Sequence, residues 1–257
     1  MQRAFSLVEL SIVLVILGLL TGGILAGQSL IKSAELRSVG EEYKRWQTAT
    51  GSFRDKYFGW PGDISNATKF WGTGTCSQNN RSPGVATCDG DSSGILGYNS
   101  KGSNENFTFW QQLANAGLVE GSYSGTSADP LGDWYDGYIS IGVNSPRSKF
   151  SKATWYPTYI DDQTIATNIF FEGSYGPTYF FGGSTTGPIN VPMLTPEQAW
   201  NIDSKLDDGL PGTGLIRTYE YTGDCHDAIQ STTAARAGTA RYKLTYTGNS
   251  CTLFFKM

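Results

Sequence analysis

Three aspartates near position 205 of this 257-residue sequence could bind a cation. Asp203, Asp207 and Asp208 fall at the C-terminal end of an expected helix, where the helix macrodipole disfavours negative charge. Carboxylate oxygens are ligands that calcium takes in proteins, so a bound calcium ion would offset this cost. Lys205 nearby, or full solvation of the carboxylates, would offset it as well.

A second acidic segment has oxygen-bearing side chains at alternate positions. Asp89, Asp91 and Ser93 precede Gly94, as ligands do in the first half of an EF-hand loop. No glutamate stands at the twelfth position, where such a loop needs its bidentate ligand. The segment could hold calcium, and ordinary turn chemistry explains it equally well.

The four cysteines are an even number, which suggests two disulfides and an oxidising compartment. Cys76 and Cys88 bracket a polar loop, and Cys225 and Cys251 bracket a segment that ends at the last expected strand. Sequential pairing is favoured because each pair is close in sequence, although three connectivities exist. The zinc-site spacings C-x-x-C and H-x-x-H do not occur in the sequence.

His226 is the one histidine of the sequence and lies between Cys225 and Asp227. A Ser-His-Asp set could form around it, and a free Cys225 thiol would make a reactive pair with it. A chain rich in serine and aspartate permits such sets by chance, so a surface histidine in a loop is the simpler interpretation. Some aromatic residues could stack on sugar rings or simply pack in the core: Trp71, Trp134, Tyr135, Trp155 and Tyr156.

The charge balance excludes an electrostatic nucleic-acid binder. The chain has 19 basic and 23 acidic residues, a net charge of −4, and no basic run. Displacing counterions from nucleic acid requires a basic stripe. A charged fraction of 16% with 32 glycines instead suits a β-rich, loop-rich secreted surface.

Residues 7–26 form an apolar run that contains three polar residues, Glu9, Ser11 and Thr21. At about 1.5 Å per residue, a helix of this length spans the roughly 30 Å hydrocarbon core of a bilayer. A cleaved secretory signal also has a basic start and an apolar stretch. The acid within the run, and the lack of an A-x-A site after it, argue against a signal peptide.

Helical sequence continues beyond the apolar run. Gly59 and Pro61 then end the pattern, so a continuous helix from Phe5 would be about 80 Å long. Its second half is amphipathic and must bury its stripe against the rest of the chain. The stripe recurs at steps of three and four residues: Val39, Tyr43, Trp46, Thr50, Phe53 and Tyr57.

The remaining chain predicts an antiparallel sheet with short helices and disulfide-closed loops, an α+β fold. Asn104 can cap a helix over residues 105–119, and Thr195 begins a capping box that leads into a second helix ended by Gly209. Segments rich in Ile, Phe, Tyr and Thr are expected to be strands: 136–143, 166–173, 178–181, 240–247 and 251–257.

The first ten residues, MQRAFSLVEL, resemble the processing signal of type IV pilins and type II secretion pseudopilins. They comprise a short basic leader, a small residue, a phenylalanine and an acid at the fifth mature position. The resemblance implies cleavage by a prepilin peptidase between Ala4 and Phe5, methylation of the Phe5 amine, and filament assembly through Glu9. Ala4 stands where the family usually has glycine, and the membrane half lacks the family's frequent proline.

Blocks further along resemble larger pilin-like proteins, at 53–63, 109–118 and 194–209. In that family a C-terminal disulfide closes an outward-facing region, as Cys225 and Cys251 would here, and major pseudopilins have a calcium loop. The resemblance implies the following division: leader 1–4, transmembrane and filament-core half of the helix 5–29, amphipathic half 30–58, and β-rich head 59–257.

The function implied is structural and not enzymatic. The subunit would polymerise with itself and other pilins or pseudopilins into a pilus-like or type II secretion filament, after contact with the prepilin peptidase and an inner-membrane assembly platform. It would be a single-pass protein among bacterial inner-membrane lipids first, and periplasmic or on the cell surface after assembly. Two alternatives remain open: a minor or tip subunit that binds a glycan or partner, and a membrane-anchored hydrolase.

Glu9 has a physical reason to lie in the apolar run. An acid in hydrocarbon is costly unless it is paired. After cleavage, the Phe5 amine of a neighbouring subunit would lie at nearly the same membrane depth. Pairing the two charges would neutralise both and set the axial register of the next subunit. The alternative is that Glu9 lies at the membrane interface.

Overall fold

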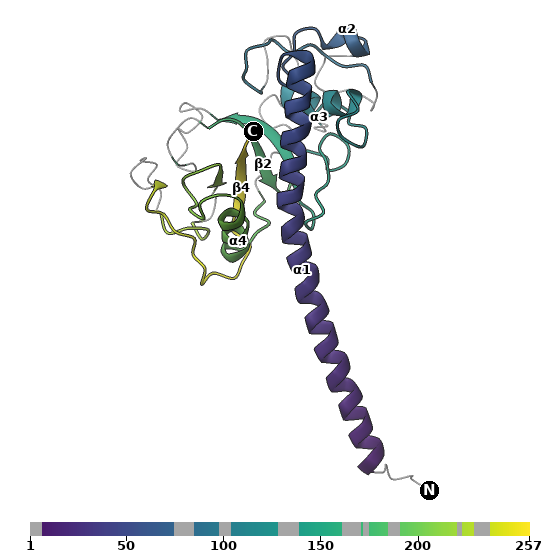
Figure 1. The fold of residues 1–257 in the computed structure, drawn as a ribbon, viewed down its shortest axis with the longest axis vertical. Helices are drawn as coiled ribbons and strands as arrows, with labels where there is room; N and C mark the ends of the chain where they lie inside the picture. The colour runs from purple at the N-terminus through teal and green to yellow at the C-terminus, as the bar shows by residue number, and fades with distance from the viewer. Residues whose placement is uncertain are drawn as a thin grey trace.

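One long helix, α1, dominates the molecule (Figure 1). Its first half protrudes alone, and the rest of the chain gathers around its second half to form the head. The head contains a four-stranded antiparallel sheet, short helices and a disulfide, so the predicted α+β fold is confirmed. This computed structural model describes residues 7–74, 85–97, 104–127, 139–160, 171, 175–184, 191–219, 223–228 and 237–257.

The helix α1, Leu7–Tyr57, is continuous over 51 residues, which confirms the long helix expected from the sequence. It ends where Phe58 adopts a left-handed backbone with φ 59°. The first buried residues along it are Ser38 and Val39, so about thirty residues precede the part that packs in the head.

The sheet has β4 at its centre although β4 is the last strand in sequence. Phe181 lies opposite Trp155 on one side of β2 and opposite Leu253 on the other. The strands expected at 178–181 and 251–257 are therefore confirmed, as parts of β2 and β4. In spatial order the strands are β1 Thr154–Ile160, β2 Gly176–Gly182, β4 Thr252–Lys256 and β3 Ile216–Tyr219.

The strand expected at 136–143 is wrong in its described part. Gly142 has φ +87°, and the N–H groups of Val143 and Asn144 donate to the carbonyl of Ser140. These hydrogen bonds form a turn. Glycine and asparagine favour turns because both residues tolerate a left-handed backbone. Ile139 is buried in the head, but this segment does not form the hydrogen-bond ladder of a strand.

The strand expected at 240–247 is also wrong. Tyr242 forms a single isolated bridge with His226, and the N–H of Leu244 donates to the Tyr242 carbonyl in a turn. Of the residues that suggested a strand, Tyr242 is buried and its hydroxyl donates to Asp203, whereas residues 244–247 are exposed. Of the strand expected at 166–173, only Phe171 lies among the described residues.

Neither edge strand, β1 or β3, was predicted from the sequence. β1 contains Pro157, which has no N–H to donate to a ladder and therefore argues against a central strand. Because β1 pairs only with β2 in the order above, the proline is tolerated at the edge. β3 has four residues, too few to give a period-two pattern.

The short helices follow their capping signals. α3, Glu105–Asn115, begins at Asn104, whose side chain accepts from the Asn106 N–H at 3.1 Å. It ends four residues before the expected 119, since Gly117 takes φ +72°. α4, Pro196–Leu206, has the full capping box at Thr195. A five-residue helix, α2, Ala67–Trp71, lies at the far end of α1 (Figure 1).

The core forms where α1 crosses the sheet and α3. Trp46 of α1 meets Trp110 of α3 with ring centroids 5.0 Å apart. The fully buried Tyr179 hydroxyl lies 2.6 Å from Thr50 Oγ1 and donates to the Trp46 carbonyl at 3.0 Å. Aromatic packing with satisfied hydroxyls therefore fixes α1 on the sheet.

Glu42 is a buried acid on the face of α1 that packs in the head. It is 4% exposed and accepts from the backbone N–H of Lys149 at 2.8 Å and from Trp155 Nε1 at 2.7 Å. Glu42 lies three residues after Val39 and four before Trp46, and therefore on the same face of α1 as the apolar stripe. These charge-assisted hydrogen bonds link α1 to Trp155 of β1 and to Lys149, which precedes β1.

Candidate functional site

The protruding half of α1 exposes a continuous apolar surface. Leu7 is 86% exposed, and Leu19 and Leu25 are 73% and 67% exposed. Soluble monomers rarely expose so large an apolar surface, which marks a membrane or protein contact. By length and composition α1 could cross a membrane, and none of its most apolar 18-residue window is buried in the head. This half of α1 is the first candidate functional surface.

Glu9 lies in the first turn of α1 and is exposed on the protruding half. It is the acid of the apolar run, as the sequence predicts. The expected cleavage and methylation residues, Ala4 and Phe5, lie outside the described residues. The role of all three residues therefore stays a prediction.

The first acidic group differs from the one expected. Asp91 lies with Asp63 and Glu105, and one carboxylate oxygen from each falls within 4.8 Å of the others. Asp89 does not join them. Its carboxylate accepts from the backbone N–H of Thr68 at 2.8 Å and from the Thr68 hydroxyl at 3.1 Å, at the start of α2. Sequence spacing could not reveal Asp63 and Glu105, because they are 28 and 14 residues from Asp91 along the chain.

Ser93 contributes its backbone rather than its side chain to this group. The N–H groups of Ser93 and Gly94 donate to the Asp63 carboxylate, both at 3.0 Å. The pKa of Asp63 is nevertheless raised, chiefly because burial disfavours its charge, and Asp91 raises it further. Asp63 and Glu105 are 4% and 1% exposed. Buried carboxylates in such proximity could hold a metal ion or a shared proton.

The second acidic group, Asp203, Asp207 and Asp208, comes together as the sequence predicts. Each of the three carboxylates already accepts a hydrogen bond from the protein. Asp203 accepts from the Tyr242 hydroxyl at 2.7 Å, and Asp207 accepts from the Ile216 N–H at 2.9 Å. The group could hold a metal ion, and it already organises the turn that leads from α4 to β3.

Burial raises the pKa of Asp203 to about 7, with smaller contributions from the charges of Asp208 and Asp207. Between about pH 4 and 7 the folded protein then holds a proton that the unfolded chain lacks, so stability falls as pH rises. We expect a loss of about 2–3 kcal/mol between pH 5 and 8, or roughly 5–10 °C in Tm.

The Asp203→Asn variant should flatten this profile, because asparagine mimics the protonated acid. The control Asp55→Asn removes an exposed acid on α1 and should keep the wild-type slope. Thermal melts of the three proteins between pH 5 and 8 measure the effect. An unchanged slope in Asp203→Asn would mean that Asp203 titrates normally.

Cys225 and Cys251 form a disulfide with their Cα atoms 5.1 Å apart. Cys88 is also disulfide-bonded, and Cys76 lies outside the described residues. The disulfide removes the free thiol that a reactive pair with His226 would need. His226 is 7% exposed and packs against Phe171 at 4.8 Å between ring centroids, so it is not the surface loop histidine that the sequence favoured.

The aromatic residues considered for sugar stacking are mainly packing residues. Trp155 is fully buried, and the Tyr156 hydroxyl lies 2.7 Å from the Asn106 side chain. Trp71 is half-buried beside Tyr57, with ring centroids 5.3 Å apart. Trp134 and Tyr135 lie outside the described residues.

Comparison with known proteins identifies one feature of the chain. Residues 1–25 match the family model of the prokaryotic N-terminal methylation motif, which is the signal of type IV pilins and pseudopilins. No curated protein and no solved structure matches the chain. The motif therefore covers the start of the protruding half of α1 and ends before the head begins.

Proposed function

We propose that this chain is a structural pilin or pseudopilin subunit, and not an enzyme, that polymerises into a type IV pilus-like or type II secretion filament. The observation that carries the proposal is the exposed apolar half of α1, which bears the methylation motif and projects from a folded head. In a membrane this surface contacts lipid. In a filament the same surface contacts other subunits, which explains why the head leaves it uncovered.

We propose the following division of the chain. Residues 1–4 are a leader, 5–29 the membrane and filament-core half of α1, 30–58 its amphipathic half, and 59–257 the head. The start of burial at Ser38 supports a boundary between the two halves of the helix in this region.

Glu9 has the central role in the proposed assembly. Its carboxylate pairs with the Phe5 amine of an adjacent subunit and thereby sets the axial register. The partners are other copies, other pilins or pseudopilins, the prepilin peptidase and an inner-membrane assembly platform. The chain lies in the bacterial inner membrane before assembly and in a periplasmic or cell-surface filament after it.

Processing of the N-terminus tests the proposal. Co-expression with a prepilin peptidase should give a mature chain that begins at Phe5 with a methylated amine, measured by the mass of the N-terminal peptide. Ala4→Gly should process at least as fast, and Phe5 should stay the first residue. A chain that keeps Met1, or that begins after Ala26, would contradict the pilin assignment.

We assign the acidic group of Asp63, Asp91 and Glu105 to calcium. Two of these carboxylates are buried, and a divalent cation would neutralise charges that burial otherwise disfavours. Millimolar calcium should stabilise the head by about 1–3 kcal/mol, because a ligand that binds the folded state raises Tm. Glu105→Gln should lose this response and the exposed-acid control Asp55→Asn should keep it. A calcium-independent Tm would mean that a shared proton serves instead.

A minor or tip subunit is the second candidate, favoured by aromatic residues at the far end of α1. Phe58 is 93% exposed, and Phe70, 53% exposed, contacts Trp71 at 5.7 Å between ring centroids. Exposed aromatic faces are suited to a glycan or protein partner. Abundance along the filament shaft supports the first candidate, and trace amounts at one end support the second.

A further inference from the structure

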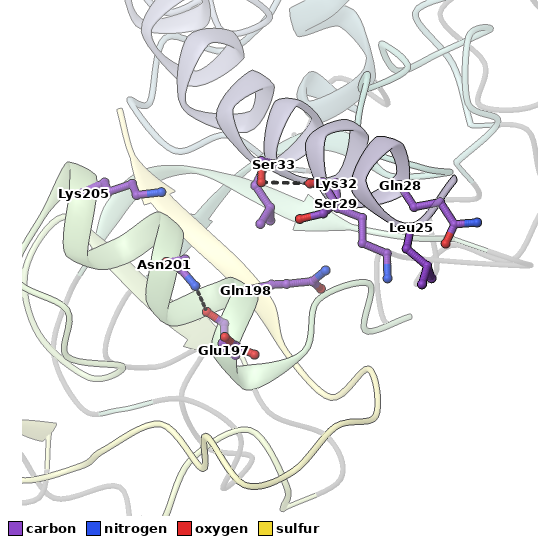
Figure 2. A pocket seen from close by; sticks show the side chains of 10 residues that line it. Leu25, Gln28, Ser29, Lys32, Ser33, Glu197, Gln198, Asn201 and Lys205 are labelled. Atoms are coloured by element: carbon purple, nitrogen blue, oxygen red, sulfur yellow. Dashed lines mark hydrogen bonds between the residues drawn. The ribbon is translucent and has the colours of Figure 1, made fainter. Parts of the chain in front are cut away.

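A groove separates α1 from α4 at the point where α1 leaves the head (Figure 2). It consists of two adjoining cavities of 490 and 430 Å³. Ser33 and Leu36 of α1, and Asn201 and Lys205 of α4, line both cavities. This groove could not be predicted from the sequence, because its two walls are about 170 residues apart along the chain.

The groove lies at the level expected for lipid headgroups, provided that the proposed membrane span is correct. The apolar run 7–26 fills about 30 Å of hydrocarbon. The lining of the larger cavity begins with Leu25 and Gln28, directly at the end of that run. The groove therefore opens where the bilayer changes from acyl chains to headgroups.

The groove is positively charged although the chain as a whole has a net charge of −4. Lys32 reaches into the space from α1 and Lys205 from α4 (Figure 2), and Glu197 is the one acid among the residues lining the larger cavity. The smaller cavity adds Arg37, Lys44 and Glu41.

Neither of the two lysines lies in an ion pair that the described residues form. The ion pair found among the described residues is Arg37–Glu41, at 3.0 Å, and it includes neither Lys32 nor Lys205. Two ammonium groups on opposite walls, with polar side chains between them, match an anion with several oxygen acceptors. Gln28, Gln198 and Asn201 supply the amide groups of this lining.

We infer that this groove binds the phosphate headgroup of an anionic phospholipid while the chain is in the membrane. Lys32 and Lys205 supply the positive charge that attracts the phosphate, and Leu25, at the end of the apolar run, contacts the start of the acyl chains. A neighbouring copy's apolar helix is a poorer occupant, because the one acid of its apolar run, Glu9, is assigned to the Phe5 amine, and both lysines would be buried without a partner. A bound lipid would fix the orientation of the head above the bilayer.

Lipid selectivity of the full-length chain tests this inference. The chain is inserted into nanodiscs that contain phosphatidylglycerol and phosphatidylcholine, and lipids that remain bound are counted by native mass spectrometry. Wild type should retain phosphatidylglycerol preferentially. Lys32→Gln and Lys205→Gln should each reduce the preference about fivefold, since one basic residue near an anionic surface contributes about that factor.

Matched controls separate the groove from overall charge. Lys56→Gln with Lys69→Gln removes two lysines at the opposite end of the head and should keep the preference. Lys32→Arg with Lys205→Arg keeps both charges and should also keep it, while millimolar inorganic phosphate should not displace the lipid.

Three results would overturn the inference. Wild type without a preference for phosphatidylglycerol would do so, as would equal loss in the Lys56 and Lys69 control. Displacement of the lipid by inorganic phosphate would identify a site for free phosphate instead. Failure of the chain to insert into any nanodisc is a separate outcome, because it would contradict the membrane span and with it the proposed function.

Discussion

Glu9→Gln should reduce filament yield about a hundredfold while leaving membrane insertion intact. Glutamine keeps the size and polarity of the side chain but cannot neutralise the amine of the adjacent subunit. An uncompensated charge in the membrane costs about 2.5–3.5 kcal/mol on insertion scales, which corresponds to that factor in assembly. Filament yield in a sheared or periplasmic fraction is compared with the amount of chain in the membrane fraction.

Two variants control this experiment. Glu9→Asp keeps the charge and should recover part of the yield. The recovery is incomplete because the aspartate side chain is one methylene group shorter. Glu41→Gln removes an acid that is 61% exposed in a surface ion pair on the same helix and should leave the yield unchanged. Filaments formed by Glu9→Gln at the wild-type level would show that register is set elsewhere.

Replacing Cys225 and Cys251 by alanine should destabilise the whole head. The bond closes a loop with a sequence separation of 26 residues, worth about 3–4 kcal/mol in the chain-entropy account. Cys251 immediately precedes β4, which pairs with both β2 and β3. Loss of the bond therefore loosens the centre of the sheet, and Tm should fall by roughly 10 °C.

The double variant Cys76→Ala with Cys88→Ala is the matched comparison. It also removes two sulfurs, but its cysteines are 12 positions apart, so the expected loss is smaller by about 0.7 kcal/mol. Thermal melts measure the Tm of both variants, and limited proteolysis near the C-terminus measures the local stability there. A Tm equal to wild type after loss of Cys225 and Cys251 would mean that the bond does not stabilise the fold.

Local signals in the sequence were sufficient to predict α1, α3 and α4, whereas α2, which has no side-chain cap at Asn66, was not predicted. Each signal depends on residues within a few positions of one another. These signals are the apolar and amphipathic halves of α1, the Asn104 cap and the Thr195 capping box. β2 and β4 were found for the same reason, because their aromatic runs are buried and regular.

Features that depend on distant parts of the chain were not predictable. Glu42 lies on the packed face of α1 because Trp155 and Lys149, more than 100 residues away, donate to it. Asp91 joins Asp63 and Glu105 through loop packing, and not through the spacing that suggested Asp89 and Ser93. The Pro157 strand is compatible with the sheet only because it lies at an edge.

The N-terminal peptide of the chain recovered from purified filaments tests the central claim most directly. The account predicts abundant chain along the filament shaft, with an N-terminal peptide that begins at methylated Phe5 and ends within α1. Filaments that lack this chain, or a filament-bound chain that still carries Met1, would contradict it.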